Sequence, residues 1–337
     1  MLRSVLLLVA LLFQLSANAA YTPQLMAIVV NEADPESRRI ADYYQLMRGV
    51  PDSNVITVNL PVDKDTVGKE RFEQVYSQVQ QKTPGYIQFY ALAWSKPYRV
   101  GCMSITSAFA FGFDKAFCAK GCKPTKQSAY FNSSSRKPYT DLGIRPTMML
   151  AGSTIENVYD MIDRGVASDA TYPKGTAYLV STSNKARNVR ANFFPSVKQH
   201  LGKRINIEIK ETDALKNKPD VLFYITGKAK VAQIESNQFI DGAIADHLTS
   251  AGGRLFGGKQ MSILRWLDAG ATASYGTVVE PCAFPQKFPH PAIVIDRYTR
   301  GETLIEAYWK SVAWPGQGLF VGEPLASPYA GLRIDKI

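Results

Sequence analysis

Two short runs of small and apolar residues, 241–246 and 270–279, constrain the fold of this chain most strongly. His247 follows the first run, Cys282 follows the second, and a helical pattern at 259–267 separates them. In open α/β sheets, ligands bind at the carboxyl ends of the strands. The spacing therefore predicts that His247 and Cys282 lie at neighbouring strand ends, on one edge of a mostly parallel sheet.

Strand and helix patterns alternate along the rest of the chain. Apolar runs typical of buried strands recur at 25–30, 55–60, 86–94, 147–150, 176–181, 204–209, 221–226 and 319–321. Apolar residues at helical spacing recur at 35–48, 72–79, 104–113, 155–164, 185–201 and 303–312. This alternation predicts a three-layer α/β/α sandwich around a mostly parallel sheet.

The first 20 residues have the pattern of a secretory signal peptide. Arg3 is basic, 5–15 is apolar apart from one glutamine, and small residues precede a cleavage point near Ala19 or Ala20. The apolar run is shorter than the about 20 residues that a membrane-spanning helix needs. We therefore expect a secreted or periplasmic protein that has no transmembrane segment after cleavage.

The remainder, 21–337, shows no linker, repeat or low-complexity tract, so we expect a single α/β domain. One segment near 114–145 is polar and rich in loop-forming residues, which predicts an insertion.

The formal net charge is +10, and the lysines and arginines are scattered. The densest cluster, 185–190, holds three basic residues. A secreted chain without a nucleic-acid-binding motif is not expected to bind nucleic acid. A basic surface suits solubility, or a partner such as an envelope protein or an anionic exported polymer. We expect no cofactor.

The four cysteines are Cys102, Cys118, Cys122 and Cys282. Secreted proteins commonly carry disulfides. A disulfide within the first three leaves one cysteine over, and that one either joins Cys282 or stays free. Zinc is a weaker alternative, because no second Cys or His pair stands at ligand spacing.

His247 and Cys282 are the candidate catalytic pair. An imidazole beside a thiol lowers the pKa of the thiol and generates the nucleophilic thiolate. Asp246 or Glu280 would orient the imidazole. The glycines at 252 and 253 would offer backbone N–H groups to an oxyanion. The alternative is structural, with Cys282 in a disulfide and His247 a satisfied residue at the sheet edge.

Gly252, Gly253 and three side chains complete the candidate binding residues at this edge. Ser250 is a second possible nucleophile, although a serine at a strand end more often caps a turn. His290 lies in a Pro-His-Pro segment, and Lys287 lies just before it. Histidine and carboxylate residues here do not form a tight ligand motif, so no metal site is predicted.

Several blocks resemble an uncharacterised family of secreted bacterial proteins. They include Asp246-His-Leu-Thr-Ser250 and Val321-Gly-Glu-Pro324, together with 31–51, 274–277, 280–282, 287–289 and 301–309. The family is associated with species that carry exosortase, a proposed protein-sorting transpeptidase of the cell envelope. The resemblance covers nearly the whole mature chain. The resemblance implies secretion and a genomic association with exosortase, and it supplies no established reaction.

The order of strands and helices also resembles, more distantly, the gingipain-type caspase-like cysteine peptidases. In that family a histidine follows one strand and a cysteine follows the next. Here the strand that resembles the histidine strand, 221–226, ends in Gly227-Lys228, and the strand that resembles the cysteine strand ends in Asp246-His247. Cys282 comes one strand later.

Two functions follow from this resemblance. In the first, the scaffold has lost peptidase activity, and its sheet edge binds an envelope partner linked to exosortase-dependent export. In the second, the dyad has shifted by one strand, and the protein is a peptidase-like hydrolase that uses His247 and Cys282. The vacant dyad positions favour the first.

Overall fold

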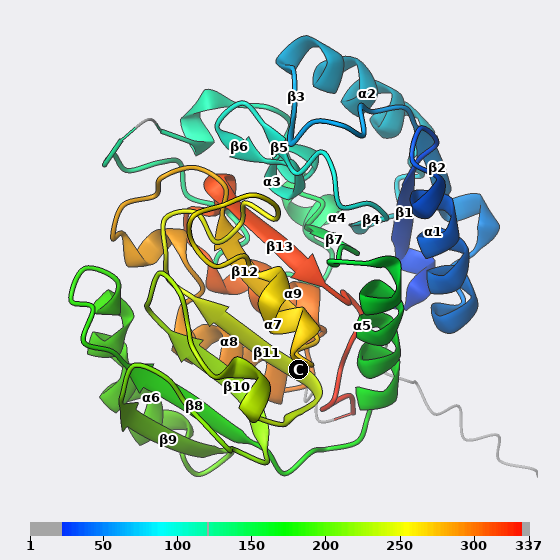
Figure 1. Cartoon of the computed structure of the whole chain (residues 1–337). Coiled ribbons are helices and arrows are strands. Elements are labelled where there is room, and N and C mark those ends of the chain that lie inside the picture. The colour runs from blue at the N-terminus through cyan, green and yellow to red at the C-terminus, as the bar shows by residue number, and fades with distance from the viewer. Residues whose placement is uncertain (1–21, 120, 332–337) are drawn as a thin grey trace, which may run out of the picture.

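The computed structural model describes residues 22–119 and 121–331 (Figure 1). The predicted signal peptide lies outside the described residues. A ten-stranded sheet forms the centre, in the order β2-β1-β4-β7-β13-β12-β11-β10-β8-β9. Its strands are β1 (Met26–Asn31), β2 (Val55–Val58), β4 (Phe89–Leu92), β7 (Thr147–Met149), β8 (Thr176–Ser181), β9 (Asn206–Glu211), β10 (Val221–Thr226), β11 (Phe239–His247), β12 (Ala273–Thr277) and β13 (Gly318–Gly322).

The sheet consists of two parallel halves that run in opposite directions. They meet where β12 pairs with β13, which is the antiparallel pairing in this sheet. On one side of this junction β13, β7, β4, β1 and β2 are parallel to one another, and on the other side β12, β11, β10, β8 and β9 are parallel. The carboxyl ends of the two halves therefore lie at opposite edges of the sheet.

Helices cover both faces of the sheet. They are α1 (Pro35–Arg48), α2 (Lys69–Lys82), α3 (Ile105–Phe111), α4 (Pro138–Leu142), α5 (Ile155–Ser168), α6 (Phe194–Leu201), α7 (Leu264–Asp268), α8 (Pro291–Thr299) and α9 (Leu304–Ser311). Contacts join α1, α5 and α7 on one face, and α6, α8 and α9 on the other. In Figure 1, α7 lies in front of the sheet, and α8 and α9 lie behind it. None of the helices in the described residues is long and apolar enough to cross a membrane.

The helix ends follow local chemistry. The Asp34 side chain accepts a hydrogen bond from the N–H of Glu36 at the start of α1, and Gly49 ends this helix in a left-handed conformation. Thr303 and Glu306 form a capping box at the start of α9. These signals are local, so the sequence predicted both helices to within one or two residues.

Two elements differ from the sequence-based expectation. The helix predicted at 259–267 is shorter, because 248–262 forms the loop after β11 and α7 begins only at Leu264. Helix α8 was not predicted. Its one signal is Pro291 at the first helical position, which fits a helix start. The predicted insertion, 114–145, contains α4 and a short 3-10 helix, Lys115–Phe117. A small separate sheet, β3 (Thr66–Val67), β5 (Arg99–Val100) and β6 (Met103–Ser104), precedes it.

A buried ion pair links the start of the chain to its last strand. Glu323 follows β13 and is fully buried. Its Oε1 accepts hydrogen bonds from Arg48 Nε at 3.0 Å and from Tyr44 Oη at 2.7 Å, and its Oε2 accepts one from Arg48 Nη2 at 2.5 Å. Arg48 also binds Asp169, just after α5. Bidentate geometry and the added tyrosine satisfy a carboxylate that would otherwise be costly to bury. Two of the blocks that resemble the secreted family, 31–51 and 321–324, thus meet in one cluster.

We expect Glu323→Gln to lower the free energy of unfolding by about 3 kcal/mol, because it leaves the Arg48 guanidinium buried without its main counter-charge. Urea denaturation followed by circular dichroism measures this change. Glu211→Gln, which removes an exposed carboxylate at the end of β9, is the matched control and should change stability by less than about 0.5 kcal/mol. Equal effects of the two variants would contradict a stabilising role for the cluster.

Candidate functional site

The carboxyl ends of β11 and β12 lie side by side, as the sequence predicted. The two strands are parallel neighbours, with Ile244 opposite Ala273. The loops that follow them, 248–262 and 278–290, therefore emerge at the same edge of the sheet. We call this edge, with the loops after β8, β10, β11 and β12, the rim.

A pocket of about 130 Å³ opens at the rim. Ser250, Glu280 and Cys282 line it, and all three were predicted as site residues. The other lining residues are Ala186, Arg187, Leu248, Thr249 and Ala283. The pocket thus combines residues from three loops, those after β8, β11 and β12.

His247 is not among the lining residues, because it is fully buried beneath the rim. Its Nδ1 accepts a hydrogen bond from the indole Nε1 of Trp266 at 2.9 Å. An indole N–H only donates, so the proton of the neutral ring is on Nε2, which donates to the carbonyl of Met261 at 3.1 Å. Burial lowers the pKa of His247 to about 4. Both nitrogens are occupied, so the ring has no free position for a catalytic proton transfer.

Cys282 is joined to Cys122 by a disulfide, and Cys102 is joined to Cys118. The pairing is one of those that the sequence left open. Cys282 therefore has no thiol, and it connects the predicted insertion to the rim. The predicted His247–Cys282 dyad does not exist in this structure, since one member is oxidised and the other is enclosed.

Asp246 does not orient His247. Successive side chains of a strand point to opposite faces. Asp246 is buried and accepts a hydrogen bond from Arg190 Nη2 at 2.5 Å, and the same nitrogen donates to the carbonyl of Thr226. Burial raises the pKa of Asp246, and Arg190 opposes this rise. The pair secures the ends of β10 and β11 to the segment before α6.

The predicted oxyanion donors are also occupied or enclosed. The N–H of Gly253 donates to the carbonyl of Thr277 at 3.0 Å. Gly253 and Gly276 approach so closely that a Cβ on either would overlap the other's backbone. Gly252 is buried against Thr249 and His247. These glycines allow the loop after β11 to pack on β12, which is a structural role.

The carboxyl end of β10 also has no open space beside it. A Cβ on Gly227 would overlap the carbonyl oxygen of Arg187. The loop after β8 therefore fills the space beside the end of β10. This contact explains physically why only glycine fits at position 227.

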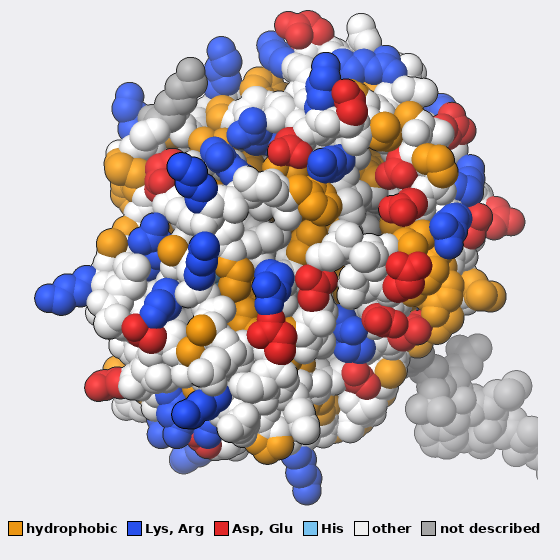
Figure 2. All heavy atoms as spheres, in the orientation of Figure 1, with side chains coloured by type: hydrophobic (Ala, Val, Ile, Leu, Met, Phe, Trp, Pro, Cys, Tyr) orange, Lys and Arg blue, Asp and Glu red, His pale blue; other side chains and the backbone are white. Residues whose placement is uncertain are grey.

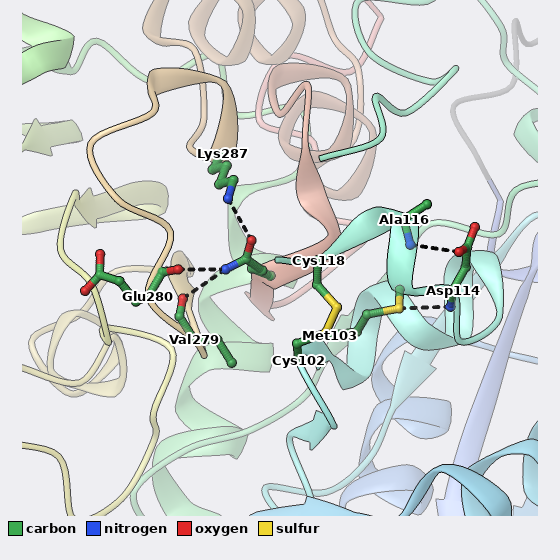
Figure 3. The surroundings of a disulfide bond; sticks show 9 residues. Cys102, Met103, Asp114, Ala116, Cys118, Val279, Glu280 and Lys287 are labelled. Atoms are coloured by element: carbon green, nitrogen blue, oxygen red, sulfur yellow. Dashed lines mark hydrogen bonds between the residues drawn. A yellow bond between two sulfur atoms is a disulfide. The ribbon is translucent and has the colours of Figure 1, made fainter. Parts of the chain in front are cut away.

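Lys287 and His290 contribute to the wall behind the rim rather than to the pocket. Lys287 is buried, and its Nζ donates to Gln317 Oε1 at 2.8 Å. The Gln317 amide in turn donates to the carbonyls of Val279 and Glu280, and Figure 3 shows Lys287 linked to these two residues through this amide. Burial lowers the pKa of Lys287 to about 8.

His290 precedes α8, and its ring lies 4.5 Å from that of Phe193, between centroids. Burial lowers the pKa of His290, as does the nearby Arg190. Within 22–119 and 121–331, no group of three or more His, Cys, Asp or Glu residues is placed to hold a metal ion.

Sequence reasoning missed Arg187 and Gln260. The Nε of Arg187 donates to Thr249 Oγ1 at 3.0 Å, and that hydroxyl donates to Gln260 Oε1 at 2.8 Å. Gln260 also accepts from the N–H of Ala251 at 2.8 Å. The basic cluster 185–190 was the only sequence signal, and it was interpreted as surface.

No protein-family model matches the sequence, and no curated protein matches it. Two solved structures are similar in fold. One is titled "Structure of Protease", with 12% identity over 91% of this chain and 79% of that chain and a TM-score of 0.50. The other is the complex of the Porphyromonas gingivalis RgpB pro- and mature domains, with 10% identity over 90% and 79% and a TM-score of 0.51. They confirm the predicted α/β fold of the caspase and gingipain type.

We expect His247 to make stability depend on pH. The folded protein keeps the ring neutral down to about pH 4, whereas the unfolded chain takes up the proton near its ordinary pKa of about 6.5. Between these values the unfolded state binds more protons, so stability falls as the pH is lowered. The loss of stability reaches about 3 kcal/mol near pH 4, and His247 causes no such loss above about pH 6.5.

Denaturation at a series of pH values tests this. His247→Asn keeps an acceptor for Trp266 but cannot titrate, so the slope between pH 6.5 and pH 4 should become shallower. His200→Asn, at an exposed position in α6, should keep the wild-type slope. An unchanged slope in His247→Asn would show that this histidine does not titrate in that window.

Proposed function

We propose that the protein is a secreted, non-catalytic binding protein of the cell envelope, built on the fold of gingipain-type peptidases. One observation carries the proposal: the thiol and the imidazole that a cysteine peptidase needs are both consumed by structural bonds. Cys282 is bonded to Cys122, and His247 is held by Trp266 and Met261. A thiolate–imidazole pair requires a free sulfur and an accessible ring nitrogen.

The compartment is supported by two features. The two disulfides fit an oxidising environment, and the sequence begins with a pattern typical of a secretory signal peptide. The proposal treats 21–337 as one α/β domain. The link to exosortase-dependent export rests on the family resemblance described above.

The proposed partner is an envelope protein or an anionic exported polymer, and not nucleic acid. The loops of the rim carry four basic residues, Lys185, Arg187, Lys228 and Lys259, together with the acidic Glu280, and Lys228 is paired with Asp213. On the face shown in Figure 2, lysine and arginine side chains are spread over the surface with acidic ones between them. This distribution favours a local contact at the rim over adhesion to a whole basic face.

A peptidase assay tests the proposal. Disulfide-intact protein is incubated with a mixture of peptides of varied sequence, and the products are followed by mass spectrometry. We expect no cleavage, and no labelling of Cys282 by iodoacetamide until the protein is reduced. Cys282→Ser, the matched control, should behave like the wild type in the cleavage assay.

The alternative function, a hydrolase that uses His247 and Cys282, is favoured only by the likeness of the scaffold to a peptidase. The same assay after mild reduction distinguishes the two. Cleavage that appears in the wild type and is lost in both Cys282→Ser and His247→Asn would establish the alternative.

Binding is tested by retention on an immobilised acidic polysaccharide against a neutral one of similar size. We expect retention on the acidic polymer that falls as salt is raised, because exposed charges are screened. Equal retention on both polymers would exclude an anionic polymer as the partner.

A further inference from the structure

We propose that the rim pocket binds a small zwitterion of the α-amino-acid type, with its carboxylate on Arg187 and its ammonium group on Glu280. The inference rests on the proposed function, because a ligand held at a rim without a nucleophile is bound and not cleaved. Two opposite charges that line one pocket and do not pair with each other carry the argument.

Arg187 is oriented for this contact by its neighbours. Its Nε is fixed on Thr249, whose hydroxyl is in turn held by Gln260. No described residue accepts a hydrogen bond from Nη1 or Nη2 of Arg187. These two nitrogens form a planar pair of donors that matches a carboxylate. Arg187 is half-buried, so little side-chain entropy remains to be lost on binding.

Glu280 lines the same pocket from the loop after β12. Its Oε1 accepts a hydrogen bond from the N–H of Cys282 at 2.8 Å, which ties the carboxylate to the loop. No described lysine, arginine or histidine lies within ion-pair distance of it. The nearest candidate on this loop, Lys287, is committed to Gln317. The disulfide to Cys122 holds the same loop in place.

The size of the pocket limits the ligand. Its volume of about 130 Å³ is well below the roughly 300 Å³ at which pockets for drug-sized ligands begin. Ala186, Leu248 and Ala283 supply apolar wall, and Thr249 and Ser250 supply hydroxyl groups. A simple anion would meet repulsion from Glu280, and a simple cation would meet repulsion from Arg187. A zwitterion satisfies both charges at once.

Isothermal titration calorimetry of the disulfide-intact protein tests the inference with glycine, alanine, acetate and ethylammonium. We expect saturable binding of glycine and alanine, and at least tenfold weaker binding of the two singly charged probes. Arg187→Gln and Glu280→Gln should each weaken glycine binding at least tenfold. Thr249→Val, which removes the acceptor that positions Arg187, should weaken it less. Lys203→Gln and Glu70→Gln remove exposed charges outside the rim and should leave it unchanged.

Two results would overturn the inference. The first is the absence of saturable binding by either amino acid. The second is acetate binding as tight as glycine binding that becomes tighter in Glu280→Gln, since this describes an anion site. Either result leaves the proposed function standing if the peptide mixture also remains intact. Cleavage of the peptides would instead overturn the proposed function itself.

Discussion

The buried carboxylate of Glu323 joins α1 and α5 to β13, the strand at which the two halves of the sheet meet. The halves run in opposite directions and share one antiparallel pairing, between β12 and β13. Helical connections between parallel strands do not by themselves determine how β13 pairs with β12. Glu323 follows β13 directly and is bound by Arg48 and Tyr44 of α1, while Gly165 of α5 leaves the space that its side chain occupies. The first helix, the middle helix and the last strand thus meet at one charge, which must stay paired because it is buried.

The rim shows how the ends of the strands of this fold are bound within the protein itself. The fold resembles that of the gingipain type, and the groups at the end of β11 make internal contacts. His247 bridges Trp266 and Met261, and Asp246 binds Arg190. Side chains that are buried in such internal hydrogen bonds and ion pairs are unavailable to a substrate. At the surface, Arg187 and Glu280 line a small pocket with opposite charges, and fixed charges of that kind suit recognition.

The sequence predicted the fold well because the decisive signals are local. Asp34, Pro35 and Gly49 define α1, and continuous apolar runs define the buried strands. It also placed His247 and Cys282 at neighbouring strand ends. Their chemical states could not be predicted, since those depend on contacts distant in sequence: Cys122 lies 160 residues from Cys282, and Trp266 reaches His247 from the next helix. Arg187 was missed for the same reason, because its partner Thr249 is 62 residues away.

The disulfide pattern has a consequence for how the chain matures. The pairing joins the first cysteine to the second and the third to the fourth, in the order of the sequence. A chain whose cysteines are oxidised in the order in which they emerge would therefore acquire its native bonds without breaking any. Cys122 must nevertheless remain reduced until Cys282 arrives, and the neighbouring Cys118 is removed from competition once it has joined Cys102. Formation of the Cys102–Cys118 bond, which closes the shorter segment, would thus leave Cys122 without a competing partner for Cys282.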